Sequence, residues 1–364
     1  MSGQSGIICG MKLRRIGVFV WVGLVLIALG LLMTTVRRLP NVTGSGEGEA
    51  DGDLEDSFPA PTPFLFQELT ILYMRGRSYE SSLSGLEKIS ENANYTSYLT
   101  SFMSDGLRIN GLLTIPKGEM PDEGWPAVVF VHGYIPPSQY RTKQNYVSYV
   151  DFLARNNLVV FKIDLRGHDQ SEGEAGGAYY SADYVTDTLS AYEALGRAEF
   201  VNDNRVGLWG HSMGGNVVFR SFVVRRDIPA VVIWAGAVYT YEDFGRYRIS
   251  DNSYRPPSQA MQRRRYREEL MRTYGEFSTE SWFWRQVVPT NYLEGVDGVL
   301  QLNHAVDDAV VSVGYSRDLV KILDNTDIIH ELNEYASGGH NISGEMFYRA
   351  MQNTVDFYQK NLAE

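Results

Sequence analysis

A short motif flanked by glycines holds the residue best suited to nucleophilic chemistry. The pentapeptide 210–214 reads GHSMG, and it stands between an apolar run, 206–209, and an apolar helical stretch, 214–224. A strand-to-helix turn this tight holds its serine in a strained conformation above the sheet and leaves no room for side chains at the two glycines. Ser212 is therefore the predicted nucleophile, and the amide of Met213 is predicted to point to the same place and stabilise an oxyanion.

The general base that a serine needs is predicted in the loop before the last helix. A serine hydroxyl is a poor nucleophile until a base removes its proton. The segment 338–341 reads GGHN and lies between a strand-like stretch, 328–335, and a helical stretch, 343–362. Its glycines would let His340 reach back to the serine, so His340 is the predicted base, with an ordinary surface histidine as the alternative.

Two adjacent aspartates are candidates for the acid of a catalytic triad. A carboxylate fixes the tautomer of the base and stabilises its charged form. Asp307 and Asp308 follow the strand-like run 299–303, in the loop where the acid is expected. Their spacing alone does not separate them.

Two further loops carry polar residues at strand ends. The run 127–131 is followed by His132, Gly133 and Tyr134, so the Tyr134 amide is predicted to be the second oxyanion donor and His132 to brace the loop. Asp164 and Arg166 follow the next apolar run and are expected to form a salt-bridged turn without a catalytic role.

The elements that must position these residues alternate between short apolar runs and helical stretches. This alternation predicts an α/β fold with a mostly parallel central sheet and helices on both faces. The stretch 239–295 breaks the rhythm with a Pro-Pro pair, a run of arginines and the aromatic tripeptide 282–284, and it is expected to form a small helical cap. The expected strands are 98–103, 107–115, 127–131, 158–163, 206–209, 230–234, 299–303 and 328–335, and the expected helices are 143–155, 181–195, 214–224, 313–323 and 343–362.

The N-terminal region reads as a membrane anchor with a tether. Residues 16–36 contain no charge and, as a helix, would span the roughly 30 Å hydrocarbon layer. A cleaved signal peptide is the alternative, although its apolar core is usually shorter. The basic residues around the segment predict a cytoplasmic tail, 1–15, and a catalytic body outside the cytoplasm. Residues 37–63 are expected to be an acidic Gly/Pro-rich linker, followed by a lead-in segment, 64–97, and the α/β domain with the candidate catalytic residues, 98–364.

Composition limits the partners and cofactors. The net charge of −11 argues against nucleic acid as the main partner. The single cysteine, Cys9, allows no intramolecular disulfide, and no residue cluster has metal-ligand or phosphate-loop spacing. We therefore predict no cofactor or metal. The predicted partner of the N-terminal helix is the membrane. The oligomeric state stays open.

With these residues placed, the chain resembles the α/β-hydrolase superfamily, specifically the prolyl oligopeptidase-like (S9) catalytic domain, over roughly 98–362. In that family the loop after the seventh strand commonly reads H-G-x-x-D-x-x-V-P. Laid on residues 304–312, this pattern places the triad acid at Asp308 and leaves Asp307 as the alternative. The motifs that carry the resemblance are SDGLRINGLLTIPKG, VVFVHGY, KIDLRGHDQSEG, GLWGHSMGG, LNHAVDDAVVSVGYSRDL and YASGGHN.

The resemblance implies a serine hydrolase that cleaves an ester or a peptide bond through an acyl-enzyme, so the predicted partner in the active site is a small ester or short peptide substrate. Oligopeptidases carry a β-propeller before the hydrolase domain, and the residues between the anchor and position 98 are too few for one. The alternative function is a non-catalytic, membrane-tethered binding protein that keeps the fold without the activity.

Overall fold

The computed structural model describes residues 63–250 and 261–362. The expected cytoplasmic tail, the membrane helix 16–36 and the linker up to residue 62 lie outside these residues. Among the helices that are described, none combines the length and the apolar character needed to cross a bilayer.

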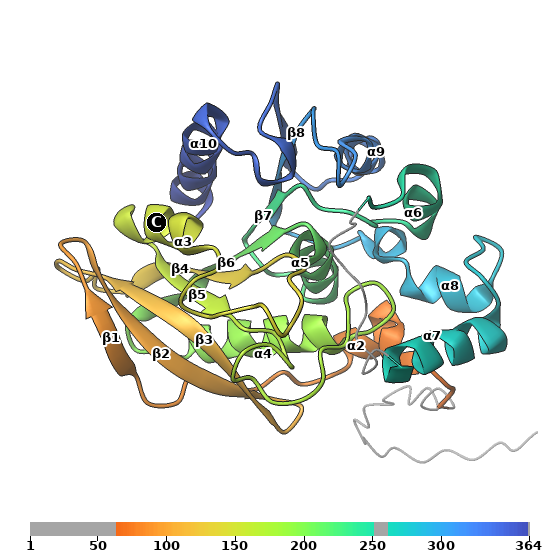
Figure 1. Ribbon diagram of the computed structural model, residues 1–364, viewed down its shortest axis with the longest axis horizontal. Helices are drawn as coiled ribbons and strands as arrows, with labels where there is room; N and C mark the ends of the chain where they lie inside the picture. Colours follow the sequence, from red (N-terminus) through yellow and green to blue (C-terminus); the bar gives the residue numbers. More distant parts are fainter. Residues whose placement is uncertain (1–62, 251–260, 363–364) are drawn as a thin grey trace, which may run out of the picture. The chain divides into compact units, whose positions relative to one another are not determined.

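One large sheet organises the described part of the chain (Figure 1). Its nine strands lie in the order β1-β2-β3-β5-β4-β6-β7-β8-β9. Strands β4 to β9 run parallel to one another, whereas β1, β2 and β3 pair antiparallel and β3 joins β5 antiparallel. The sheet is therefore mostly parallel, as predicted. The strands are β1 Glu87–Glu91, β2 Tyr95–Ser104, β3 Leu107–Pro116, β4 Trp125–Val131, β5 Val159–Ile163, β6 Val201–His211, β7 Ala230–Trp234, β8 Val299–Ala305 and β9 His330–Tyr335.

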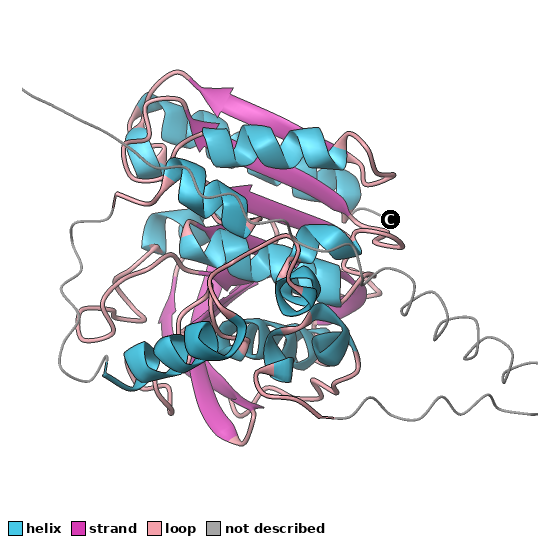
Figure 2. Ribbon diagram, turned by 90° about the vertical axis from the view of Figure 1, so that its right-hand side faces the viewer, coloured by secondary structure: helices cyan, strands magenta, loops and turns pink. Residues whose placement is uncertain are grey.

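Helices cover both faces of this sheet, as the alternation predicts (Figure 2). Successive side chains of a strand point to opposite faces, so Val128 and Phe130 of β4 pack in one apolar core, while Val129 and Val131 pack in the other. Helices α3 and α10 complete the first core, and α4, α5 and α9 complete the second. These helices are α3 Val147–Arg155, α4 Asp183–Gly196, α5 Met213–Val224, α9 Gly314–Leu323 and α10 Glu345–Asn361.

The chain between β7 and β8 forms a separate group of helices, in the region where a cap is expected. Its aromatic side chains build a core of their own, in which Phe283 and Trp284 are fully buried, while Trp282 is 51% exposed. The helices are α6 Tyr241–Tyr247, α7 Met261–Tyr274, α8 Trp282–Val287 and the 3₁₀ turn η3 Pro289–Tyr292.

The lead-in segment is fastened to this helical group. It contains the 3₁₀ turn η1 Gln67–Leu69 and helix α2 Ile71–Arg75. Phe66 stacks edge-on against Tyr266 with ring centroids 4.9 Å apart, and Phe66 and Leu69 belong to the same apolar core as α7 and α8. The hydroxyl of Tyr274 donates a hydrogen bond to the Leu65 carbonyl at 2.7 Å. The segment and the helices therefore share one core.

Candidate active site

Ser212 lies at the sharp turn between β6 and α5. Its backbone has φ 53° and ψ −117°, a conformation that non-glycine residues rarely adopt and that is found mainly at functional sites. The Ser212 amide donates to the Trp234 carbonyl of β7 at 2.8 Å, which ties the strained residue to the sheet. This is the strand–turn–helix setting that the motif predicts.

The two glycines of the motif are required by close backbone contacts. A Cβ atom on Gly210 would lie 2.4 Å from the carbonyl oxygen of Gly214. A Cβ atom on Gly214 would lie 2.4 Å from the carbonyl oxygen of Val131, at the end of β4. Both distances are far below van der Waals contact, so the turn can form only with glycine at these positions. The crowding that the motif predicts is therefore confirmed.

His340 lies in the loop between β9 and α10 and is held by Asp308 from the loop after β8. The Nδ1 atom of His340 is 2.8 Å from Oδ2 of Asp308, and the His340 side chain is 18% exposed. A carboxylate can only accept, so Nδ1 carries the proton. The other ring nitrogen, Nε2, is then an acceptor in the neutral ring. His340 and Ser212 line the same cavity.

Asp308 is fixed by groups that favour its charged form. Its Oδ1 accepts hydrogen bonds from the amides of Val310 and Val311 at 2.8 and 2.9 Å. Nε2 of His304 lies 3.3 Å from Oδ2 of Asp308. Burial of the carboxyl acts to raise its pKa, but the hydrogen bonds from His304 and His340 outweigh burial and hold the pKa of Asp308 well below its ordinary value. The side chain is therefore a carboxylate at neutral pH.

Asp307, the alternative acid, makes different contacts. Its carboxylate accepts from the amides of Gly338 and Gly339 at 3.2 and 2.8 Å. Asp307 therefore supports the backbone of the loop that carries His340, whereas Asp308 contacts the ring itself.

The two predicted oxyanion donors border the same cavity as Ser212. Met213 is the first residue of α5, and the amides of a first helical turn have no partner within the helix. No side chain caps this end of α5. Tyr134 lies in the loop after β4, next to the carboxyl end of the neighbouring strand β6. The structure thus brings the two residues to one cavity with the serine.

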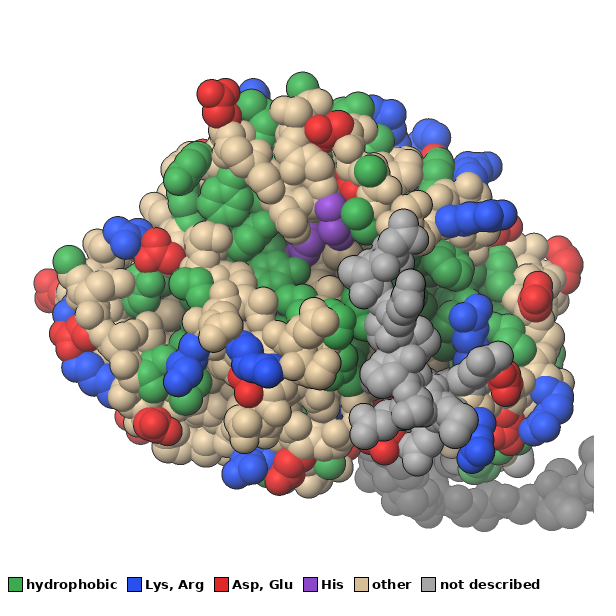
Figure 3. Space-filling model, in the orientation of Figure 1, with side chains coloured by type: hydrophobic (Ala, Val, Ile, Leu, Met, Phe, Trp, Pro, Cys, Tyr) green, Lys and Arg blue, Asp and Glu red, His purple; other side chains and the backbone are tan. Residues whose placement is uncertain are grey.

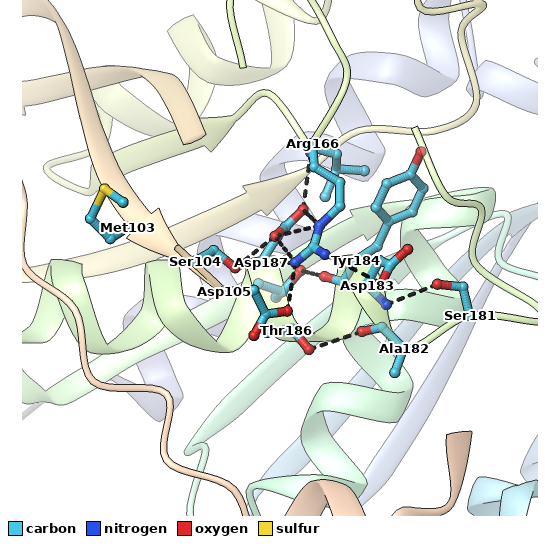
Figure 4. A network of polar contacts seen from close by, with 12 residues as sticks. Met103, Ser104, Asp105, Arg166, Ser181, Ala182, Asp183, Tyr184, Thr186 and Asp187 are labelled. Atoms are coloured by element: carbon cyan, nitrogen blue, oxygen red, sulfur yellow. Dashed lines mark hydrogen bonds and ion pairs between the residues drawn. The ribbon is translucent and has the colours of Figure 1, made fainter. Parts of the chain in front are cut away.

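The expected salt-bridged turn of Asp164 with Arg166 is wrong. Arg166 instead points to helix α4, where its guanidinium binds Asp187 at 2.6 Å, with Asp183 and Asp105 close by (Figure 4). Asp164 accepts a hydrogen bond from Tyr140 at 2.6 Å. Strand β5 ends at Ile163 and residues 165–167 form a turn, so the two side chains are not held on one face of an extended strand and find separate partners.

His132 is fully buried beneath the loop that follows β4. Its ring stacks on Tyr140 with centroids 4.2 Å apart, and its Nδ1 lies 2.7 Å from the Gly133 carbonyl. Burial, and then the neighbouring His168, hold the pKa of His132 well below its ordinary value, so the ring is neutral. This is the position of a residue that braces the loop.

Three further residues lie near the site, and none of them has a role predicted from the sequence. His304 contacts Asp308, while Tyr146 and His211 are hydrogen-bonded to each other at 2.7 Å. His304 stands at the histidine of the family pattern laid on 304–312, and that position is the sequence signal that could have identified it. Tyr146 and His211 are 65 positions apart, so their contact exists only in the folded chain.

The cavity that Ser212 lines is open to the surface and has a volume of about 1970 Å³. Aromatic side chains from both the sheet side and the cap side line it, among them Tyr134, Phe244 and Phe347. In the space-filling view, histidine side chains are visible in a hollow bordered by apolar side chains (Figure 3). The volume is sufficient for a drug-sized or larger substrate.

Comparison with protein families finds a match over part of the chain. Residues 125–267 match the family described as serine aminopeptidase, S33. This stretch contains Tyr134, Ser212 and Met213, but it ends before Asp308 and His340.

Comparison with solved structures shows the same fold in esterases and peptidases. An acetyl xylan esterase from a Thermoanaerobacterium species superposes with a TM-score of 0.58 at 18% identity, covering 82% of this chain and 95% of the esterase. The dipeptidyl peptidase 4 of Porphyromonas gingivalis gives 0.57 at 20% identity, covering 74% of this chain and 36% of the peptidase. A puromycin-hydrolyzing peptidase of Mycobacterium tuberculosis gives 0.56 at 18% identity, covering 75% of this chain and 40% of the peptidase.

Proposed function

We propose that this chain, a serine hydrolase of the α/β-hydrolase superfamily, cleaves ester or peptide acyl bonds with a triad of Ser212, His340 and Asp308. The observation that carries the proposal is the bond between His340 Nδ1 and Asp308. It leaves His340 Nε2 to accept a proton in the cavity that Ser212 also lines.

The reaction then has two halves. Ser212 Oγ attacks the substrate carbonyl while His340 Nε2 takes the hydroxyl proton, and the amides of Met213 and Tyr134 donate to the oxygen that becomes negative. The tetrahedral intermediate breaks its bond to the leaving group, which receives the proton from His340. A water molecule then attacks the acyl-enzyme while His340 takes one of its protons, and the second tetrahedral intermediate releases the carboxylic acid as His340 returns that proton to Ser212 Oγ. Asp308 stabilises the charged imidazole in both halves.

An ester is the favoured substrate, and a peptide is the second candidate. The region shared with this chain makes up 95% of the acetyl xylan esterase but only 36% and 40% of the two peptidases, and this supports the ester. The description of the matching family as serine aminopeptidases supports the peptide alternative. In both cases the aromatic cavity would receive an apolar or aromatic part of the substrate.

The hydrolase is proposed to be tethered to a membrane by residues 16–36, with the catalytic body outside the cytoplasm. The support for this proposal is the uncharged 21-residue run and the basic residues that precede it. Deleting residues 16–36 should move the protein from the membrane fraction to the supernatant. Protease added to intact cells should digest the body, and digestion only after lysis would overturn this orientation.

Labelling with a fluorophosphonate tests the enzymatic proposal, because such probes react with activated serines. Wild-type protein should be labelled and Ser212→Ala should not. No labelling of the wild type, or equal labelling of Ser212→Ala, would favour a non-catalytic binding protein instead. Short nitrophenyl esters compared with aminoacyl and prolyl anilides then decide between ester and peptide substrates.

A further inference from the structure

A chain of hydrogen bonds joins the three loops that carry the proposed catalytic groups. The Gly133 amide donates to Oη of Tyr146 at 2.9 Å, this oxygen lies 2.7 Å from Nδ1 of His211, and His211 Nε2 lies 2.9 Å from the His340 carbonyl oxygen. Gly133 adjoins one proposed oxyanion donor, His211 adjoins the proposed nucleophile, and His340 is the proposed base. We infer that Tyr146 and His211 are positioning residues that hold these three loops in register for acyl transfer. The inference rests on the proposed function.

The chemistry of the partner groups determines which atom donates and which accepts in each of the three hydrogen bonds. The His340 carbonyl can only accept, so Nε2 of His211 carries a proton. In a neutral ring Nδ1 is then an acceptor, and the Tyr146 hydroxyl donates to it. Burial, and then the neighbouring His340, lower the pKa of His211 to about 3, so the ring is neutral at physiological pH. All three bonds therefore run in one direction, an arrangement in which each bond strengthens the next.

The backbone is shaped to allow these contacts. A Cβ atom on Gly133 would lie 2.6 Å from Oη of Tyr146 and 2.9 Å from Nδ1 of His211, so only glycine leaves room for the hydroxyl and the imidazole. Tyr146 itself has φ 60°, a left-handed conformation that is unusual for a bulky residue, at the position before α3. Local strain of this kind persists only where surrounding contacts enforce it.

The geometry explains how these three hydrogen bonds fix the positions of the proposed catalytic groups. His211 is 2% exposed and its ring lies 4.7 Å from the His340 ring, so the bond to the His340 carbonyl fixes the backbone from which the base projects. The Gly133 amide is fixed at the other end, one residue before the Tyr134 amide. Removing the phenol hydroxyl leaves both the Gly133 amide and His211 Nδ1 without this partner, and both loops gain freedom relative to Ser212.

The test measures the rate and the stoichiometry of fluorophosphonate labelling in detergent-solubilised full-length protein. The variants are Tyr146→Phe, His211→Phe, His211→Gln and the Tyr146→Phe/His211→Phe double variant. Tyr95→Phe is the matched control, because Tyr95 also donates a buried hydroxyl to a residue of α3, Asp151, at 2.7 Å and lies outside the cavity. The kcat and KM for a nitrophenyl ester are measured in parallel.

Tyr146→Phe and His211→Phe should each label to full stoichiometry but about 10- to 100-fold more slowly than wild type, since small misplacements of reacting groups have effects of this size. The loss should appear in kcat, with KM changed less than about threefold, because positioning acts in the transition state. His211→Gln, whose amide can still donate to the His340 carbonyl, should recover part of the rate. The double variant should be labelled no more slowly than the slower of the two single variants, since both substitutions interrupt the same series of hydrogen bonds.

Three results would contradict either the positioning role or the proposed function, and they can be told apart. Labelling of Tyr146→Phe at the rate of Tyr95→Phe would overturn the positioning role. Reduced stoichiometry at the wild-type rate would show partial unfolding and would also overturn it. Absence of labelling in the wild type, or labelling that survives Ser212→Ala, would instead remove the proposed function on which the inference rests.

Discussion

Nδ1 of His340 lies 2.8 Å from Oδ2 of Asp308, although Asp307, the adjacent residue, also reaches the loop that carries His340. The two aspartates hold different parts of this loop. Asp308 holds the imidazole ring, and Asp307 holds the backbone amides of Gly338 and Gly339. The division follows from the chain geometry, since neighbouring side chains in a turn point in different directions.

Asp308→Asn and Asp307→Asn should therefore have different effects. Asn at 308 can present an amide donor to Nδ1 and favour the wrong tautomer, so we expect kcat to fall about ten-thousandfold, as in triads of this kind. Asp307→Asn should lower kcat less than about tenfold and cost about 1 kcal/mol of unfolding free energy, because it weakens hydrogen bonds to two amides. Steady-state kinetics and urea unfolding measure the two effects, and equal losses of kcat would contradict the division.

The charge of Asp308 predicts a dependence of stability on pH. Its pKa in the fold lies below the ordinary value of 3.8, so folding favours the charged form. This stabilisation is present above about pH 4 and is lost as the pH falls through the lower folded-state value. Urea unfolding from pH 7 to pH 2.5 should show a steeper acid loss of unfolding free energy in wild type than in Asp308→Asn. Parallel curves would show that another carboxyl is responsible.

Gly214→Ala should disrupt the nucleophile turn. The added methyl group would lie 2.4 Å from the Val131 carbonyl, so we expect a loss of at least about 1–3 kcal/mol of unfolding free energy. Gly245→Ala is the control, because nothing lies within 4 Å of a Cβ there and the residue is inside helix α6. That substitution should stabilise the helix by about 0.5–1 kcal/mol, as alanine does relative to glycine. Thermal unfolding of both variants gives the comparison.

Arg166 should contribute to stability rather than to the chemistry. Arg166→Met would leave the fully buried Asp187 without its cation, and breaking such a pair costs about 3–5 kcal/mol. Arg317→Met breaks a surface pair with Glu334 and should cost about 1 kcal/mol or less. Chemical unfolding measures both losses, and kcat per folded molecule should stay near wild type in each variant. A loss of kcat specific to Arg166→Met would contradict a purely structural role.

Sequence reasoning predicts the buried elements of the fold well and the exposed edges poorly. The apolar run of β4 is predictable because both faces of the strand are covered. Strand β1, which reads EKISE and is mostly exposed, has no apolar alternation; it pairs with β2 and packs only Ile89 against an apolar core. The first half of β6 is missed for the same reason, since Asn202 to Arg205 are polar.

The candidate site is predictable only as far as local motifs extend. Ser212, His340 and the pair of aspartates stand in loops that chain order and motif identify. The contact of Tyr146 with His211 depends on how α3 meets the end of β6, and no local pattern encodes that approach. The pairing of Arg166 with Asp187 is missed likewise, because the nearest acid in sequence is not the nearest in space.

The shared core of the lead-in segment and the cap has a mechanical consequence. Phe66 and Leu69 pack with Trp284 and its neighbours, and the Leu65 carbonyl is bound by Tyr274. A displacement of α7 would therefore also disturb residues 64–69. Because Tyr266 and Arg267 of α7 line the cavity, the lead-in segment helps to set the position of one of its walls.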